Sequence, residues 1–165
     1  MININDILST IEQVHSLNEK QTIYVGKPTF AFFKEYVLTY DNDFYEPLSS
    51  RIDIDAFVTK VHTLSTTFVL IHDGDIAGLI ASYFYDLSSE KGFITLTHTK
   101  HEFRGQHLST ILLKAVQDYA RSIKFKFIDL MVYRENTPAF NLYQKHDFHI
   151  LTDNNGRCLM RWETK

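Results

Sequence analysis

The 165-residue chain has only one cysteine, three prolines and six glycines, and each shortage excludes something. A single cysteine, Cys158, can form neither an internal disulfide nor a cysteine-based zinc site. It stands in the alternating segment 157–160, which predicts a buried strand residue rather than a nucleophile. Because prolines and glycines are so few, no linker or low-complexity tract is expected, and the length suits one domain covering residues 1–165.

Long apolar runs and a basic excess are also missing. No segment approaches the roughly 18 apolar residues that a membrane-spanning helix needs. Residues 1–6 lack the basic and apolar regions of a signal peptide. The chain carries 17 Lys and Arg against 20 Asp and Glu, a net charge of −3, whereas proteins that track phosphate backbones usually show a basic excess. These observations predict a cytoplasmic protein that binds neither nucleic acid nor a membrane.

The first part of the chain, residues 1–62, reads as helical and irregular. We expect Asp6 to cap one helix, Pro28 to open a second, and a third to follow Asp53. The first of these rests on apolar residues that recur at helical spacing, namely Ile7, Leu8, Ile11, Val14 and Leu17.

From about residue 66 onward the pattern changes to alternating strands and helices. The expected strands are 66–72, 76–85, 92–99, 127–133, 149–152 and 157–162. The expected helices are 108–121 and 138–146. Since the first three strands follow one another closely, they form an antiparallel meander, while the helical crossover makes strands 92–99 and 127–133 parallel neighbours. The prediction is a mixed α/β (α+β) fold with a mostly antiparallel central sheet and helices on both faces.

Residues 103–110 form a short polar turn with one glycine between a strand and a helix. Such a turn directs several backbone N–H groups and the positive end of the helix dipole toward one point. Phosphate and pyrophosphate groups bind at sites of this kind. The sequence therefore predicts that this turn binds a phosphate or pyrophosphate group, although the turn alone predicts no reaction.

Two blocks of sequence resemble the GNAT superfamily of N-acetyltransferases. Residues 104–109 resemble its phosphate-loop motif, with the Arg104-Gly105 pair in place and with His107 and Ser109 at the positions of loop glycines or small residues. Residues 136–148 resemble the second signature of the family, with Asp147 in place of a glycine. The matching residues of this second block are Asn136, Ala139, Leu142, Tyr143, Lys145 and Phe148.

This resemblance implies acetyl-CoA as cofactor and a sheet whose two central parallel strands splay apart to admit it. Tyr143 would be the general acid for the leaving thiolate and His98 the base, directly or through a water. A backbone amide near Thr99 would stabilise the oxyanion. The implied cofactor-binding residues are Leu96, Thr97, Thr99, Arg104, Gly105, Gln106, His107, Leu108, Ser109, Thr110, Asn136, Ala139 and Tyr143.

The same residues have simpler interpretations. Tyr143 would otherwise be a core aromatic, Arg104 a solvated arginine, and His98 a strand histidine that faces solvent or a helix. We expect His107 to adopt an ordinary helix-start conformation, and Asp147 to tolerate a left-handed cap. His98 and His101 alone do not make a metal site.

The resemblance further implies that residues 1–62 build the acceptor side and residues 66–162 the acetyl-CoA core. The early aromatics lie among Asp41, Asp43 and Glu46, which would suit a small cationic amine or an amino sugar attacking the thioester directly in a ternary complex. Tyr83 and Tyr85 share a strand face and would line the same site. The alternatives are a protein or peptide acceptor, or a degenerate CoA-binding module without catalysis; the chain would be a monomer or a homodimer. The aromatics in question are Phe30, Phe32, Phe33, Tyr36, Tyr40, Phe44 and Tyr45.

Overall fold

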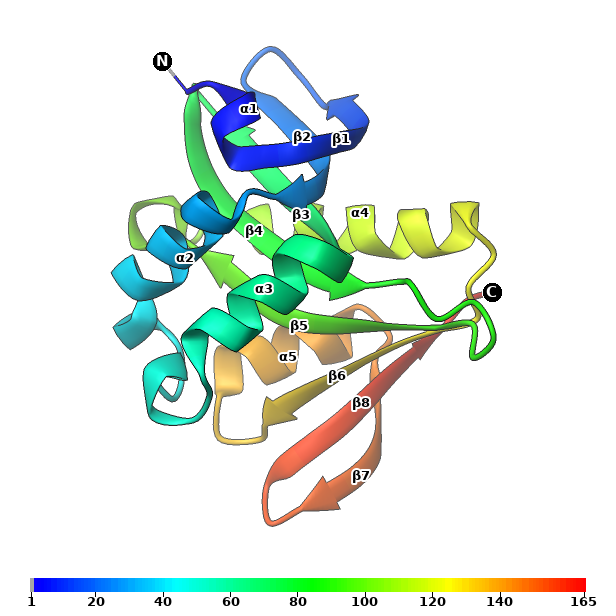
Figure 1. The fold of residues 1–165 in the computed structure, drawn as a ribbon. Coiled ribbons are helices and arrows are strands. Elements are labelled where there is room, and N and C mark those ends of the chain that lie inside the picture. Colours follow the sequence, from blue (N-terminus) through cyan, green and yellow to red (C-terminus); the bar gives the residue numbers. More distant parts are fainter. Residues whose placement is uncertain (1) are drawn as a thin grey trace.

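A computed structural model describes residues 2–165, and its centre is one sheet of eight strands (Figure 1). The strand order is β1-β2-β3-β4-β5-β6-β8-β7, and every neighbouring pair is antiparallel except β5–β6. The strands are β1 (Leu8–Ser16), β2 (Gln21–Pro28), β3 (Ser65–His72), β4 (Asp75–Tyr83), β5 (Lys91–Thr99), β6 (Phe127–Tyr133), β7 (His149–Asn154) and β8 (Arg157–Glu163). The predicted mixed, mostly antiparallel sheet is confirmed.

Helices cover both faces of this sheet, as predicted. Figure 1 shows α2 and α3 in front of the strands and α4 and α5 behind them. The Thr29 side chain caps α2 by accepting from the Phe32 amide, and Asp53 caps α3 in the same way, so Pro28 ends β2 rather than opening the helix. The helices are α1 (Ile4–Ile7), α2 (Phe30–Thr39), α3 (Ile54–Leu64), α4 (Leu108–Ser122) and α5 (Thr137–Lys145).

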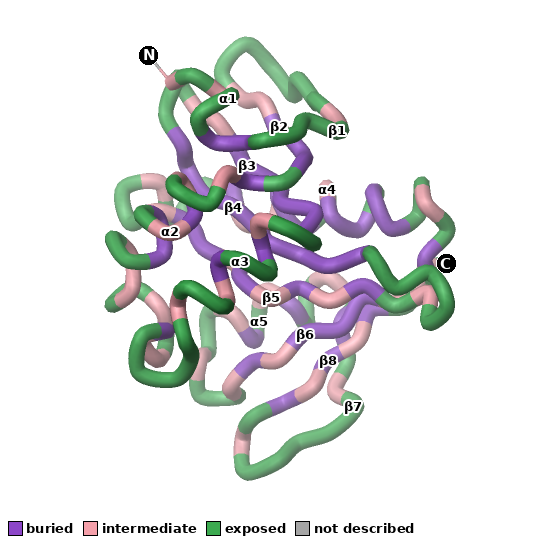
Figure 2. Tube along the Cα trace, in the orientation of Figure 1, coloured by how far each residue is buried: buried purple, intermediate pink, exposed green. Residues whose placement is uncertain are grey.

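The sheet separates two apolar cores. Leu112 and Leu113 of α4 are fully buried against one face, and Phe33 of α2 and Val58 of α3 against the other. Figure 2 shows burial following the central strands and the inward sides of these helices. Cys158 of β8 lies in the first core, which confirms the prediction of a buried strand residue. Within residues 2–165, no helix is both long and apolar enough to cross a membrane.

The prediction of a helical region over residues 1–62 is wrong for its first part. Residues 8–16 and 21–28 form an antiparallel strand pair at the edge of the sheet, and only α1 precedes them. The register of this pair slips between Leu8 and Thr10 and again between Ile11 and Gln13. Since each bulge adds one residue, the two-residue alternation of a strand becomes a spacing of three, which imitates a helix.

The parallel pair β5–β6 separates partway along its length. Pairing runs from Lys91 opposite Phe127 to Ile94 opposite Leu130, and then it ends, although β5 continues to Thr99. On the other side of β5 the pairing with β4 slips between Ala81 and Ser82, which leaves Thr95 as an extra residue. The backbone of β5 after Ile94 therefore faces a gap where a sheet neighbour would otherwise be.

Gly78 of β4 lets β5 approach closely beside this gap. A Cβ atom at position 78 would lie 2.4 Å from the carbonyl oxygen of His98 and 3.0 Å from the Cα of Thr99, both of them backbone atoms. We therefore expect Gly78→Ala to lower the free energy of unfolding by about 1–3 kcal/mol, because the strand must shift. Urea unfolding followed by circular dichroism measures this loss. An unchanged unfolding midpoint would contradict the close approach.

Candidate functional site

A cavity of about 820 Å³ opens where β5 and β6 separate. Its walls come from the loop after α2, from β5, from the turn before α4, from the end of β6 and from α5. Both predicted catalytic residues line it, and so does every predicted cofactor-binding residue except Gln106. Those residues are Leu96, Thr97, His98, Thr99, Arg104, Gly105, His107, Leu108, Ser109, Thr110, Asn136, Ala139 and Tyr143.

The turn before α4 has the conformation of an anion site. The backbone of His107 within it differs from the prediction. His107 is left-handed, with φ 61° and ψ 22°, so the predicted ordinary helix-start geometry is wrong. A residue with a Cβ adopts this region at a cost of about 1–2 kcal/mol, which explains why the family pattern favours glycine here. His107 makes no side-chain cap, and within residues 2–165 no partner appears for the N–H groups of Leu108, Ser109 and Thr110. These groups remain open to an anion.

Arg104 and Ser109 tie this turn to the end of β5. The Arg104 Nε donates to the Thr99 carbonyl at 3.1 Å, and the Ser109 and Thr99 hydroxyls lie 2.8 Å apart. The Arg104 guanidinium also lies 3.5 Å from Asp43 Oδ2 and keeps 47% of its side-chain surface exposed. It can therefore contact a phosphate without leaving its present partners.

Tyr143 reaches the cavity from α5. Its ring is buried beside Phe148, and its hydroxyl donates to Thr97 Oγ1 of β5 at 3.0 Å. Burial raises the pKa of Tyr143, which keeps the phenol protonated. The ring is thus a core aromatic, while the hydroxyl lies beside the diverging part of β5 with a proton to donate.

His98 lies on the opposite face of β5 and packs against α2. Its Nδ1 is 2.7 Å from the Tyr36 hydroxyl, and its Nε2 is 3.0 Å from Asp43 Oδ2. The ring centroids of Tyr40 and Phe44 lie 4.8 and 5.4 Å from the centroid of the imidazole. Burial lowers the pKa of His98, and the neighbouring Asp43 opposes part of that effect. The histidine therefore faces a helix, as its simpler interpretation holds, and it also lines the cavity.

His98 and Tyr143 meet the same cavity from two sides of the sheet. Along β5, Leu96 belongs to the core beneath α2 and α3, whereas Thr97 faces Tyr143 of α5. A continuous sheet would keep these faces apart. Because β6 diverges after Leu130, residues from both faces of β5 line one cavity.

The remaining predicted residues lie at the two ends of α5 and in a second cavity. Asn136 begins α5 without a side-chain cap, and it lines the cavity beside Ala139. Asp147 is left-handed with φ 67°, as predicted for the end of α5. Tyr83 and Tyr85 line a second cavity of about 340 Å³, which shares Phe57, Phe93 and Thr95 with the first.

The early aromatic region contributes only in part. Phe44 and Tyr45 line the main cavity with Asp43 and Glu46, whereas Phe33 is buried in the core. Arg51, Tyr133 and Arg157 also line the cavity and were not expected from the sequence, because nothing local distinguishes them. For Tyr133 and Arg157, alternation along the strand predicts a face of the sheet but not the distance from the turn before α4.

Comparison with known proteins gives three findings. The model of the Acetyltransferase (GNAT) family matches residues 30–148. A curated L-2,4-diaminobutyric acid acetyltransferase of Vibrio parahaemolyticus is 26% identical over 101 residues, which are 61% of this chain and 56% of that protein, so the chain spans little more than half of that relative.

Among solved structures, the ribosomal-protein-S18-alanine N-acetyltransferase of Escherichia coli superposes with a TM-score of 0.69 at 14% identity, over 87% of this chain and 94% of that one. The PaiA N-acetyltransferase of Thermoplasma acidophilum, solved with coenzyme A, superposes with a TM-score of 0.64 at 12% identity, over 86% and 98%. These two likenesses show a shared fold.

Proposed function

Because the chain belongs to the Acetyltransferase (GNAT) family, we propose that it transfers the acetyl group of acetyl-CoA to the primary amine of a small molecule. One observation carries the proposal: the anion-binding turn, the gap between β5 and β6, and the Tyr143 hydroxyl all open to one cavity. Family enzymes use acetyl-CoA, and the three features correspond to its pyrophosphate, its pantetheine arm and its thioester.

The pyrophosphate would lie on the N–H groups that begin α4, between residues 106 and 109, beside Arg104. The pantetheine arm would take the position of the missing strand pairing next to Leu96, Thr97 and Thr99, with Asn136 and Ala139 on its other side. A backbone amide close to Thr99 would donate to the thioester oxygen as negative charge develops there.

Transfer would proceed by direct attack, without a covalent enzyme intermediate. The neutral amine nitrogen bonds to the acetyl carbon, the carbon–sulfur bond breaks, and the thiolate takes a proton from Tyr143. The proton lost by the amine is assigned to His98 or to a water that it orders. Since both ring nitrogens are hydrogen-bonded, His98 accepts that proton only after one partner moves aside or gives way to water.

A small cationic amine or an amino sugar is the acceptor that we favour. Asp43 and Glu46 line the cavity together with Phe44 and Tyr45, a combination of carboxylates and aromatic rings that suits an ammonium group. The curated relative is named for a small diamine acid, which agrees with this choice. A peptide N-terminus is the second candidate, because one structural neighbour is named for ribosomal protein S18.

The test is a turnover assay that follows release of the CoA thiol with 2,4-diaminobutyrate, spermidine, glucosamine and an alanine-terminal peptide. Turnover with a free amine and not with the peptide supports the proposal. Turnover with the peptide alone identifies a protein acetyltransferase. Binding of acetyl-CoA without turnover of any of these amines identifies a non-catalytic module.

Arg104→Ala is expected to raise the Kd of acetyl-CoA about 10-fold, because a charge-assisted hydrogen bond to phosphate is lost. Titration calorimetry measures the change. Arg121→Ala is the matched control, since Arg121 lies near the other end of α4 with a similarly exposed side chain (46% against 47%). Equal Kd values of acetyl-CoA for the two variants would show that Arg104 does not contact the phosphate groups.

A further inference from the structure

We propose that Asp43 is the residue that binds the ammonium group of the acceptor, and that His98 and Tyr36 hold its carboxylate in place. This inference rests on the proposed function and adds the residue that selects a positively charged substrate. It goes beyond the sequence prediction, in which Asp43 is only one of several acidic residues among early aromatics.

The two carboxylate oxygens of Asp43, which lines the cavity, differ in their contacts. Oδ2 lies 3.0 Å from His98 Nε2 and 3.5 Å from the Arg104 guanidinium. Oδ1 has no hydrogen-bond partner among residues 2–165, and the side chain is 34% exposed in the cavity wall. A carboxylate fixed through one oxygen and open at the other is a ready acceptor for an N–H⁺ donor.

The hydrogen bonds of His98 fix its role as a positioning residue in this state. Because Nε2 faces a carboxylate, it carries the hydrogen and donates to Asp43. Nδ1 then carries the lone pair and accepts from the Tyr36 hydroxyl. The chain Tyr36–His98–Asp43 leaves no free lone pair on the imidazole, whose side chain is only 3% exposed. An incoming ammonium group therefore meets Asp43, not His98.

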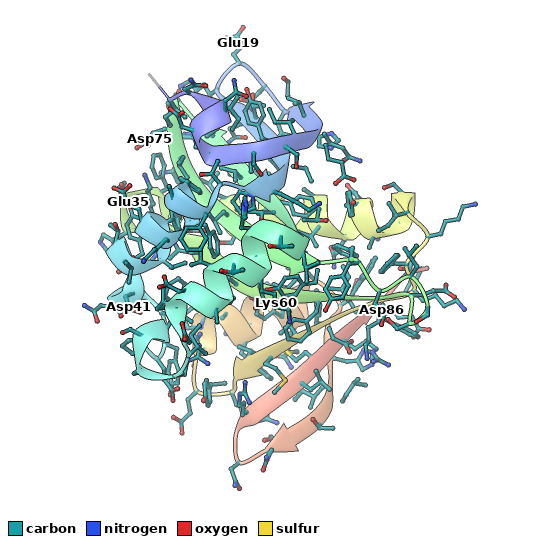
Figure 3. The ribbon with its side chains drawn as sticks, in the orientation of Figure 1. Glu19, Glu35, Asp41, Lys60, Asp75 and Asp86 are labelled. Atoms are coloured by element: carbon teal, nitrogen blue, oxygen red, sulfur yellow. The ribbon has the colours of Figure 1, made fainter. Side chains whose placement is uncertain are left out.

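The other acidic side chains nearby have different partners. Glu46 also lines the cavity and also uses one oxygen: its Oε2 accepts from the Tyr133 hydroxyl at 3.3 Å and lies 3.7 Å from Arg51, so β6 and Arg51 hold it rather than His98 and the phosphate turn. Asp41 accepts the amide and hydroxyl of Ser49, and it lies at the left margin of the molecule in Figure 3. Asp43 thus combines an unpaired oxygen, a place in the cavity wall and a connection through Arg104 to the phosphate turn.

The experiment compares wild type with Asp43→Asn and Asp43→Glu, using whichever amine of the panel wild type acetylates fastest. Loss of a charge-assisted hydrogen bond predicts that Asp43→Asn raises the KM of the amine about 10- to 100-fold. The Kd of acetyl-CoA should stay within about 3-fold of wild type. Raising the salt concentration should increase the wild-type KM and leave that of Asp43→Asn nearly unchanged, because only the charged pair is screened. Asp118→Asn, an exposed site on α4, is the control for loss of one charge.

Asp43→Glu keeps the charge, and it should bring the KM back to within about 10-fold of wild type. Tyr36→Phe tests the positioning chain and should raise the amine KM more than it lowers kcat.

If wild type turns over an amine and Asp43→Asn leaves its KM and salt dependence unchanged, the assignment of Asp43 is overturned while the proposed function stands. If Asp43→Asn does not fold, a Tyr36→Phe variant that loses kcat and keeps the wild-type KM of the amine overturns it. If wild type acetylates none of the amines, the proposed function fails and the assignment fails with it.

Discussion

Tyr143→Phe is expected to lower kcat by about 100-fold or more, while the Kd of acetyl-CoA stays close to that of wild type. The substitution removes the phenolic proton that lies beside Thr97 of β5 and keeps the buried ring in the core. General acid catalysis by a positioned side chain contributes about 10²- to 10⁴-fold. Release of the CoA thiol measures kcat, and titration calorimetry measures binding of the cofactor.

Tyr119→Phe provides the control for this experiment. Tyr119 is also a buried tyrosine with one hydrogen bond, to Glu12 at 2.6 Å, but it lies on α4 and outside the cavity lining. Loss of the Tyr119 hydroxyl should lower the stability of the protein and leave kcat nearly unchanged. If Tyr143→Phe keeps more than half of the wild-type kcat, the leaving thiolate takes its proton from another donor, and Tyr143 is only a core residue.

Arg161→Met is expected to lower the free energy of unfolding by about 3–5 kcal/mol, because it leaves a buried carboxylate without its partner. Asp129 of β6 is 3% exposed and lies opposite Arg161 of β8. The guanidinium donates to both carboxylate oxygens, at 2.7 and 2.9 Å. Urea unfolding of wild type and of Arg161→Met measures the difference in the free energy of unfolding.

The exposed pair Arg134–Asp153 is the matched control, with an N–O distance of 2.7 Å and side chains 50% and 35% exposed. Arg134→Met should cost less than about 1 kcal/mol, as surface pairs usually do. The double variant Arg161→Met with Asp129→Leu should recover much of the loss, since no unpaired charge remains. Equal losses for Arg161→Met and Arg134→Met would show that Asp129 is solvated.

Much of the fold could be predicted because its signals are local. The strands at 66–72 and 127–133 and the helix beginning at Leu108 follow directly from alternation and helical spacing, and the structure has them within a residue or two. The parallel pairing of β5 and β6 follows from the helical crossover between them. The cofactor residues predicted from the two motif blocks, 104–109 and 136–148, line one cavity, with Gln106 as the exception.

Bulges explain the clearest failure. In β1 the apolar residues Leu8, Ile11 and Val14 are three apart because two bulges interrupt the alternation, so the spacing imitates a helix. Ile11 and Val14 are 41% and 52% exposed, since β1 is an edge strand with little core beneath it. Neither bulges nor edge positions leave a distinct mark in a single sequence.

Long-range contacts account for what was missed at the site. The sequence singled out His98, but its partners Tyr36 and Asp43 are 62 and 55 residues away and belong to α2 and the turn that follows. Only the folded chain brings them against β5. The left-handed conformation of His107 was likewise hidden, because a histidine in a helix-start turn gives no sign of the backbone that a glycine would favour.

Titration calorimetry of the full chain with acetyl-CoA and with desulfo-CoA measures whether the gap between β5 and β6 holds the cofactor. We expect one site per chain with micromolar affinity for both ligands, weakened by Arg104→Ala and unaffected by Arg121→Ala. Absence of binding by the folded wild-type protein would show that the gap does not hold acetyl-CoA, because the His107 side chain would then close the turn before α4 to pyrophosphate.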